Sequence, residues 1–171
     1  MNTIPFRIVG FDLDGTLLDT SKDLGAAVNH ALSLVGRPPV PDEAVSGLIG
    51  GGSRLMLRRA LALTGGDEGL DVDALYAPLL AFYEDNIAVH TALYPGGAAM
   101  LDALDHAGVA IAMVTNKPQP LAEKLLGELG LLGRFACVIG AGLGGLAQPR
   151  PRGGGALVGP GGGRGSGSAG D

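Results

Sequence analysis

A short apolar run that ends in two carboxylates constrains the fold of this chain more than any other feature. Residues 7–11 (RIVGF) are apolar and rich in strand-forming types, which predicts a short buried strand. Asp12, Asp14 and Gly15 follow it at once, in the segment DLDGT. Polar residues directly after a buried strand mark the edge of a parallel sheet where ligands bind. The N-terminus therefore favours an α/β fold with a ligand site after its first strand.

The remaining elements alternate as an α/β fold requires, with one long interruption. A helical block follows the first strand, and then come a helix, a strand, a helix and a strand, at 98–107, 109–114, 120–129 and 136–139. This alternation predicts a Rossmann-like, doubly wound parallel sheet that is incomplete. The block is too long for one crossover, so we expect an inserted helical cap. The expected domains are a core at 1–18 and 94–140, a cap at 19–93, and a tail at 141–171.

The tail has a composition of its own. The chain holds 31 glycines and 11 prolines, and the glycines crowd into residues 141–171. No helical or strand period runs through this stretch, which predicts a disordered Gly/Pro/Arg-rich tail. A GC-rich gene read in the wrong frame gives such a composition, and a natural flexible linker is the alternative. We favour the frame change, because the tail begins inside an unfinished sheet.

Composition narrows the class of partner and the compartment. The net charge is −5, and no basic stretch alternates with aromatic residues, which argues against nucleic-acid binding. No apolar run reaches the roughly 18 residues that a membrane helix needs. Cys137 is the single cysteine, so an internal disulfide is impossible and a reducing compartment is expected. We therefore expect a cytoplasmic protein; the sequence predicts no oligomeric state.

The polar residues at the strand ends suit phosphate chemistry. Asp12 can attack a phosphorus atom to form an aspartyl-phosphate, and Asp14 can protonate the leaving oxygen and later deprotonate water. Both reactants are anions, so we expect Mg²⁺, held by Asp12 and Asp14, between them. Thr115 and Asn116 follow the second predicted strand, and we expect them to bind phosphate oxygens. An exposed strand end is the alternative for these two residues.

The segments FDLDGTL (11–17) and VTNK (114–117) resemble the first and second motifs of haloacid dehalogenase-like phosphatases. The resemblance implies a Rossmann-like core with a movable helical cap and a magnesium-dependent reaction through an aspartyl-phosphate. With Asp14 present, the chain resembles the phosphotransfer branch, because the dehalogenase branch lacks an acid/base at that position. FDLDGTLLD (11–19), IGGGSRL (49–55) and YPG (94–96) most resemble bacterial phosphoglycolate phosphatases. The substrate that this implies is 2-phosphoglycolate, a small phosphorylated metabolite.

The cap also supplies candidate residues. Gly51, Ser53 and Arg54 lie in a glycine-rich loop and the helix after it, with Ser53 a candidate N-cap. In the family the matching loop lies over the active site, so we expect these residues to face the substrate. A helix-breaking loop and a surface arginine are the alternatives. Lys117 is interpreted as a solvated surface lysine.

The resemblance also implies residues that this chain does not show. The family has a phosphate-binding lysine and a later acidic metal ligand, both after the third strand. Here no lysine follows Lys124, and Asp171 is the only acid after Glu128. We therefore expect weak Mg²⁺ binding and severely reduced turnover. The alternatives to a phosphoglycolate phosphatase are a sugar-phosphate phosphatase or phosphomutase, a non-catalytic phosphate-binding protein, and a defective truncated fragment.

Overall fold

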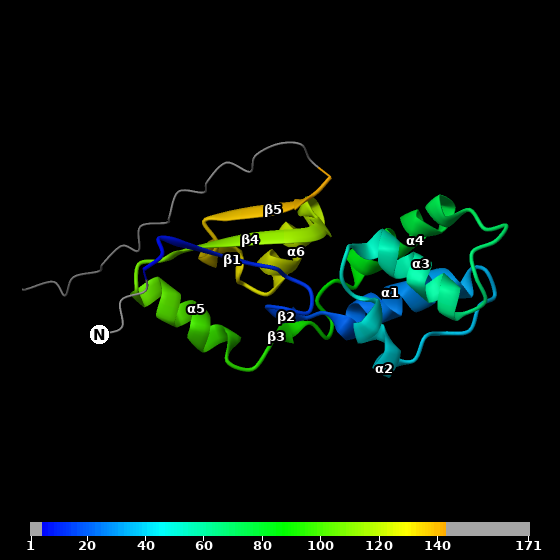
Figure 1. Cartoon of the computed structure of the whole chain (residues 1–171), viewed down its shortest axis with the longest axis horizontal. Helices are drawn as coiled ribbons and strands as arrows, with labels where there is room; N and C mark the ends of the chain where they lie inside the picture. Colours follow the sequence, from blue (N-terminus) through cyan, green and yellow to red (C-terminus); the bar gives the residue numbers. More distant parts are fainter. Residues whose placement is uncertain (1–4, 143–171) are drawn as a thin grey trace, which may run out of the picture.

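The computed structural model describes residues 5–142 of the 171-residue chain (Figure 1). The predicted tail therefore lies outside the described residues from position 143 onward. The elements, in chain order, are β1 (Ile8–Phe11), β2 (Leu18–Asp19), α1 (Ser21–Ser33), α2 (Asp42–Val45), the 3-10 turn η1 (Ser46–Leu48), α3 (Ser53–Leu63), α4 (Val72–Asp85), β3 (Ala92–Leu93), α5 (Gly97–His106), β4 (Ala110–Pro118), α6 (Gln119–Glu128), the 3-10 turn η2 (Leu132–Arg134) and β5 (Cys137–Ala141). In the described part, no helix has both the length and the apolar run needed to span a membrane.

The main sheet has three parallel strands in the order β1-β4-β5. Phe11 of β1 pairs with Met113 of β4, and Met113 pairs with Val138 of β5. All three strands therefore end at the same edge of the sheet, and the loop after β1 lies beside the end of β4. This arrangement confirms the predicted α/β fold with a parallel sheet.

The two faces of this sheet are covered unequally. Ile111, Met113 and Val138 point to one face and are at most 1% exposed. That face packs against α5 and α6, whose apolar residues recur at helical spacing. Ile8, Val114 and Ile139 point to the other face and are 56%, 51% and 43% exposed. Within the described residues, this second face is largely open.

Strands β1 and β4 differ from their predictions. The first strand was expected to be buried, but β1 is half exposed because β4 is its only neighbour among the described residues. The second strand was expected to end at Val114, but β4 continues to Pro118, with an irregular register toward β5 after Val114. Side chains alternate along it, so Met113, Thr115 and Lys117 lie on the buried face.

Helices α1 to α4, called the cap from here on, gather at one end of the molecule, away from the sheet (Figure 1). Their apolar stripes meet in a common interior, and Leu32, Leu57, Leu61 and Leu79 are at most 1% exposed. Helix α3 begins at Ser53, as predicted, but the capping role expected for Ser53 is wrong. The N-cap is Gly52, and Ser53 donates to or accepts from the Tyr76 hydroxyl at 2.9 Å.

Two short strands connect the cap to the sheet. The chain leaves the core through β2 and returns through β3, and the two pair antiparallel, Leu18 with Leu93 and Asp19 with Ala92. Just beyond them, the buried carboxylate of Asp23 accepts bonds from the backbone N–H groups of His90 and Thr91 and from the Thr91 hydroxyl, at 2.8–3.0 Å. These bonds thus link the segment that enters the cap, after β2, to the segment that leaves it, before β3.

Candidate active site

A pocket of about 40 Å³ lies where the strand ends of the sheet meet the cap. That volume holds only a few water molecules. The sheet and α6 contribute polar residues and two apolar ones, and the cap contributes the glycine loop and several apolar side chains. The lining residues are Asp12, Asp14, Leu24, Ile49, Gly50, Gly51, Gly52, Ser53, Met56, Leu80, Tyr83, Thr115, Asn116, Lys117, Pro118 and Leu121.

The loop after β1 presents the two carboxylates. Asp12 is exposed, and its Oδ1 accepts the N–H of Leu13 at 2.7 Å. The chain then turns back on itself, with Gly15 at φ 74° and its N–H donating to Leu18 O at 3.0 Å. A side chain is strained at that φ, so glycine suits this turn. The turn leaves both Asp12 and Asp14 in the pocket, one exposed and one half-buried.

The second predicted pair lies beside the first, because β4 is paired with β1. Thr115 is 9% exposed, and its hydroxyl accepts the backbone N–H of Lys117 at 3.2 Å. Asn116 is exposed and lines the pocket. A Cβ on Gly52 would lie 3.4 Å from the carbonyl oxygen of Asn116, at φ 93°. The cap loop therefore lies against the end of β4, and the positive φ of Gly52 favours glycine there.

Lys117 is not a surface residue, and that interpretation is wrong. Its side chain is buried on the pocket face of β4, with 5% of the residue exposed. Its Nζ lies 3.0 Å from Oδ1 of Asp14 and donates to the Tyr83 hydroxyl at 2.8 Å. Burial lowers the pKa of Lys117, and the charges of Asp14 and Asp12 oppose this shift. The site therefore contains a buried cation between its two acids and the cap.

Tyr83 is the second residue that sequence reasoning missed. It belongs to α4 of the cap, is 1% exposed, and its ring lies 4.3 Å from Nζ of Lys117. Burial, with the charges of Asp14 and Asp23, raises the pKa of its hydroxyl, which therefore stays protonated. In the sequence Tyr83 is only one member of the apolar stripe of a helix. The alternation of β4 is the one pattern that could have indicated that Lys117 faces inward.

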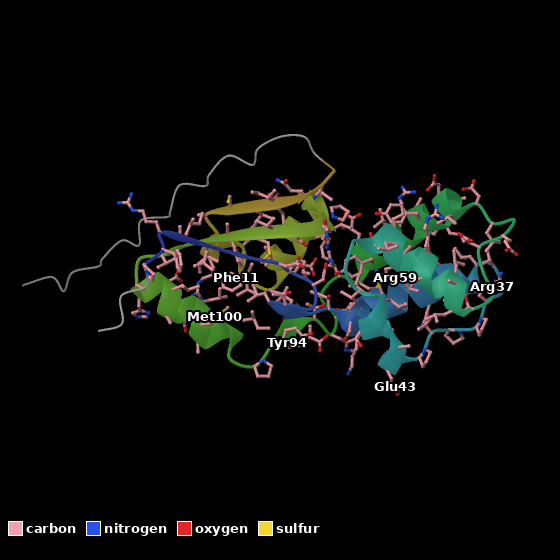
Figure 2. The ribbon with its side chains drawn as sticks, in the orientation of Figure 1. Phe11, Arg37, Glu43, Arg59, Tyr94 and Met100 are labelled. Atoms are coloured by element: carbon pink, nitrogen blue, oxygen red, sulfur yellow. The ribbon has the colours of Figure 1, made fainter. Side chains whose placement is uncertain are left out.

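The cap residues predicted to face the substrate divide into two groups. Gly51 and Ser53 line the pocket, whereas Arg54 is not among its lining residues. Arg54 pairs with Asp73 and lies over the ring of Tyr76. Arg59, seen on α3 in Figure 2, donates to the carbonyl oxygens of Leu48 and Gly50 and so fixes the start of the glycine loop.

The donor set for a cation is small. Within residues 5–142, no group of three His, Cys, Asp or Glu side chains forms a metal site. Asp12 and Asp14 offer carboxylate oxygens, and the Oδ1 atom of Asp14 is buried and accepts no well-directed hydrogen bond from the described residues. Mg²⁺ can be bound by one or two carboxylates together with waters and substrate phosphate. The oxygens present therefore suit Mg²⁺, with a minimal set of protein ligands.

Comparison with known proteins places this arrangement in a family. The family described as haloacid dehalogenase-like hydrolase matches residues 6–158, most of the chain. The chain belongs to that family. As a haloacid dehalogenase-like hydrolase, it carries its first family motif after β1 and its second within β4, side by side at one sheet edge.

Two curated relatives of this hydrolase are named as phosphatases. It is 42% identical over 153 residues to a phosphoglycolate phosphatase of Pseudomonas putida, covering 87% of this chain and 54% of the relative. An N-acetylmuramic acid 6-phosphate phosphatase of the same organism is 38% identical over 133 residues, covering 78% and 59%. The crystal structure of a predicted phosphoglycolate phosphatase from Haemophilus somnus superposes with a TM-score of 0.74 at 28% identity, covering 81% and 64%. The chain thus spans little more than half the length of these curated relatives.

Proposed function

We propose that this chain is a phosphomonoester hydrolase that converts 2-phosphoglycolate and water to glycolate and phosphate in the cytoplasm. The observation that carries the proposal is the convergence of Asp12, Asp14 and Thr115 in one pocket, at the ends of two adjacent parallel strands. The names of the relatives support a small phosphorylated substrate.

The proposed reaction has two steps, which use Asp12 and Asp14 in different roles. In the first, a carboxylate oxygen of Asp12 bonds to phosphorus while the ester P–O bond breaks, and Asp14 gives a proton to the leaving oxygen. In the second, water attacks phosphorus, its proton passes to Asp14, and the bond to Asp12 breaks. Thr115 and Asn116 bind the phosphate oxygens. Asp12 and Asp14 would hold Mg²⁺, which would neutralise charge between the nucleophile and the phosphate.

The cap encloses this chemistry. The cap and the strand ends line the pocket from opposite sides, so we expect a movement of the cap to admit the phosphate ester. When the cap returns, Gly51 and Ser53 lie over the substrate, and the apolar side chains of the cap exclude bulk water. Because the described part has no third carboxylate at the site, we expect slower turnover than in longer relatives.

The test is phosphate release by the full 171-residue chain in the presence of Mg²⁺. We expect release from 2-phosphoglycolate to exceed release from a panel that includes glucose 6-phosphate and N-acetylmuramic acid 6-phosphate, and to stop on chelation. Equal or faster release from the sugar phosphates would favour the alternative that one of the relatives suggests. No release from any ester would refute the proposal, and a rate equal to that of a longer relative would refute the expected slowness.

A further inference from the structure

Among the residues that line the pocket, Lys117 is the one lysine or arginine. The nearby arginines of the cap are engaged elsewhere. Arg54 pairs with Asp73, Arg58 with Asp67, and Arg59 holds the glycine loop. A phosphate dianion in this pocket would therefore lie near two carboxylates, Asp12 and Asp14, and near one basic side chain of the pocket lining, Lys117.

The geometry of Lys117 leaves it able to bind a further anion. An ammonium group carries three N–H donors. The structure records one acceptor for Nζ, the Tyr83 hydroxyl at 2.8 Å, and an ion-pair partner, Oδ1 of Asp14 at 3.0 Å, which accepts no well-directed hydrogen bond from the described residues. Both hold Nζ in the pocket wall that Asp12 and Thr115 also line. A third donor therefore remains for an atom that enters the pocket.

We propose that Lys117 is the phosphate-binding cation of this chain, held in place by Tyr83 of the cap and Asp14 of the core. This inference rests on the proposed function, because it assigns a ligand to the same pocket. It explains why a lysine is buried at the end of β4, where burial is costly without a charged partner. It also places a lysine at the site in a chain that has no lysine after Lys124. Lys117 then contacts the phosphate directly, while Tyr83 acts as a positioning residue.

The first test is calorimetric titration of the full chain with inorganic phosphate in the presence of Mg²⁺. We expect Lys117→Met to weaken phosphate binding at least about tenfold, because it removes a charged hydrogen bond. Lys117→Arg keeps the charge and should regain part of the affinity. Lys124→Gln removes the same charge from an exposed pair with Glu128 on α6 and should bind phosphate as the wild type does.

Removing one member of a buried ion pair can unfold a protein, so a second variant is needed. Asp14→Asn combined with Lys117→Met removes both charges, and replacing both partners is tolerated far better than replacing one. This double variant has the same net charge as the wild type, yet we expect it to bind phosphate at least about fivefold more weakly when both are titrated without Mg²⁺, which Asp14 would otherwise help to hold. Affinity equal to that of the wild type in either variant, once a cooperative melt shows that it is folded, would overturn the proposal.

The wild type provides a measurement that needs no substitution at the site. The chain contains three lysines, Lys22, Lys117 and Lys124, so the NMR signals of their side chains can be assigned by elimination with Lys22→Gln and Lys124→Gln. We expect added phosphate to shift the Lys117 signal alone. Phosphate binding without a shift at Lys117 would overturn this inference and leave the proposed function standing. A wild type that neither binds phosphate nor hydrolyses esters would overturn both.

Discussion

The cap and the sheet of this molecule are completed to different degrees. Four helices close around Leu32, Leu57, Leu61 and Leu79, and none of these side chains is more than 1% exposed. The sheet buries one face equally well but leaves Ile8, Val114 and Ile139 open on the other. Nevertheless, the candidate catalytic residues Asp12 and Asp14 lie in the loop that follows the first strand of the sheet. The difference teaches that packing and chemistry are concentrated in different parts of this chain.

The substitution Asp12→Asn should separate packing from chemistry most clearly, because it should change the rate of phosphate release and leave thermal stability unchanged. Asp12 is exposed and supports no packing, so the melting temperature should stay near that of the wild type. Loss of the attacking oxygen should lower phosphate release from 2-phosphoglycolate at least about 1000-fold. Rate and thermal melting are measured on the same preparation. A variant that keeps a tenth of the rate would show that Asp12 is not the nucleophile.

The packing of the cap is tested by two leucines on one helix. Leu57 is 0% exposed and Leu63 is 64% exposed, and both belong to α3. Leu57→Ala should lower the free energy of unfolding by about 2–5 kcal/mol, because it opens a cavity. Leu63→Ala should change it by less than about 0.5 kcal/mol. Urea unfolding of both variants gives the comparison, and equal effects would mean that the cap interior is not closely packed.

The link between cap and sheet should show a somewhat smaller effect. Asp23 is 2% exposed and accepts bonds from His90 and Thr91, where the chain leaves the cap. Asp23→Ala leaves those donors without their acceptor, so we expect a loss of about 2–3 kcal/mol in unfolding free energy. Amide hydrogen exchange should rise first at His90 and Thr91. Unchanged protection there would show that the carboxylate does not hold the crossing.

The smallest effect is expected from a matched pair on the two faces of the sheet. Val138 is 1% exposed on the covered face, and Val114 is 51% exposed on the open face. Val138→Thr buries a hydroxyl and should cost about 1–3 kcal/mol. Val114→Thr should lie within about 0.5 kcal/mol of the wild type, because its hydroxyl meets solvent. If Val114→Thr destabilises as strongly, the open face is covered in solution.

Sequence patterns were sufficient for the elements with a clear period. The helix at Ser53–Leu63 and the start of the strand after Gly108 follow from spacing alone, and Asp12 follows β1 as expected. Thr115 was expected to follow a strand but lies inside β4. The two-residue strands β2 and β3 were missed because two residues cannot display a period. Strand β1 was expected to be buried because an apolar run does not reveal how many neighbours a strand has.

Lys117 shows why the candidate site could be predicted only in part. A lysine is seldom buried, so the general expectation favoured the surface. Its burial depends on Asp14, about a hundred residues earlier in the chain, and on Tyr83 in the cap. Neither contact can be predicted from the residues around the second motif, because both partners are distant in the sequence. The roles of all the predicted site residues stay predictions, and Arg54 lies outside the pocket lining.

The pairing of β2 with β3 has a consequence for how such a chain can be rebuilt. Because Leu18 pairs with Leu93, the two ends of the insert are as close together as the two strands of a β-hairpin. The entropy of closing a connection grows only slowly with its length. The register of β1 and β4 therefore sets no limit on what stands between Asp19 and Ala92. We therefore expect that parts of the insert away from Asp23, the glycine loop and Tyr83 can be lengthened or shortened without moving Asp12 and Asp14.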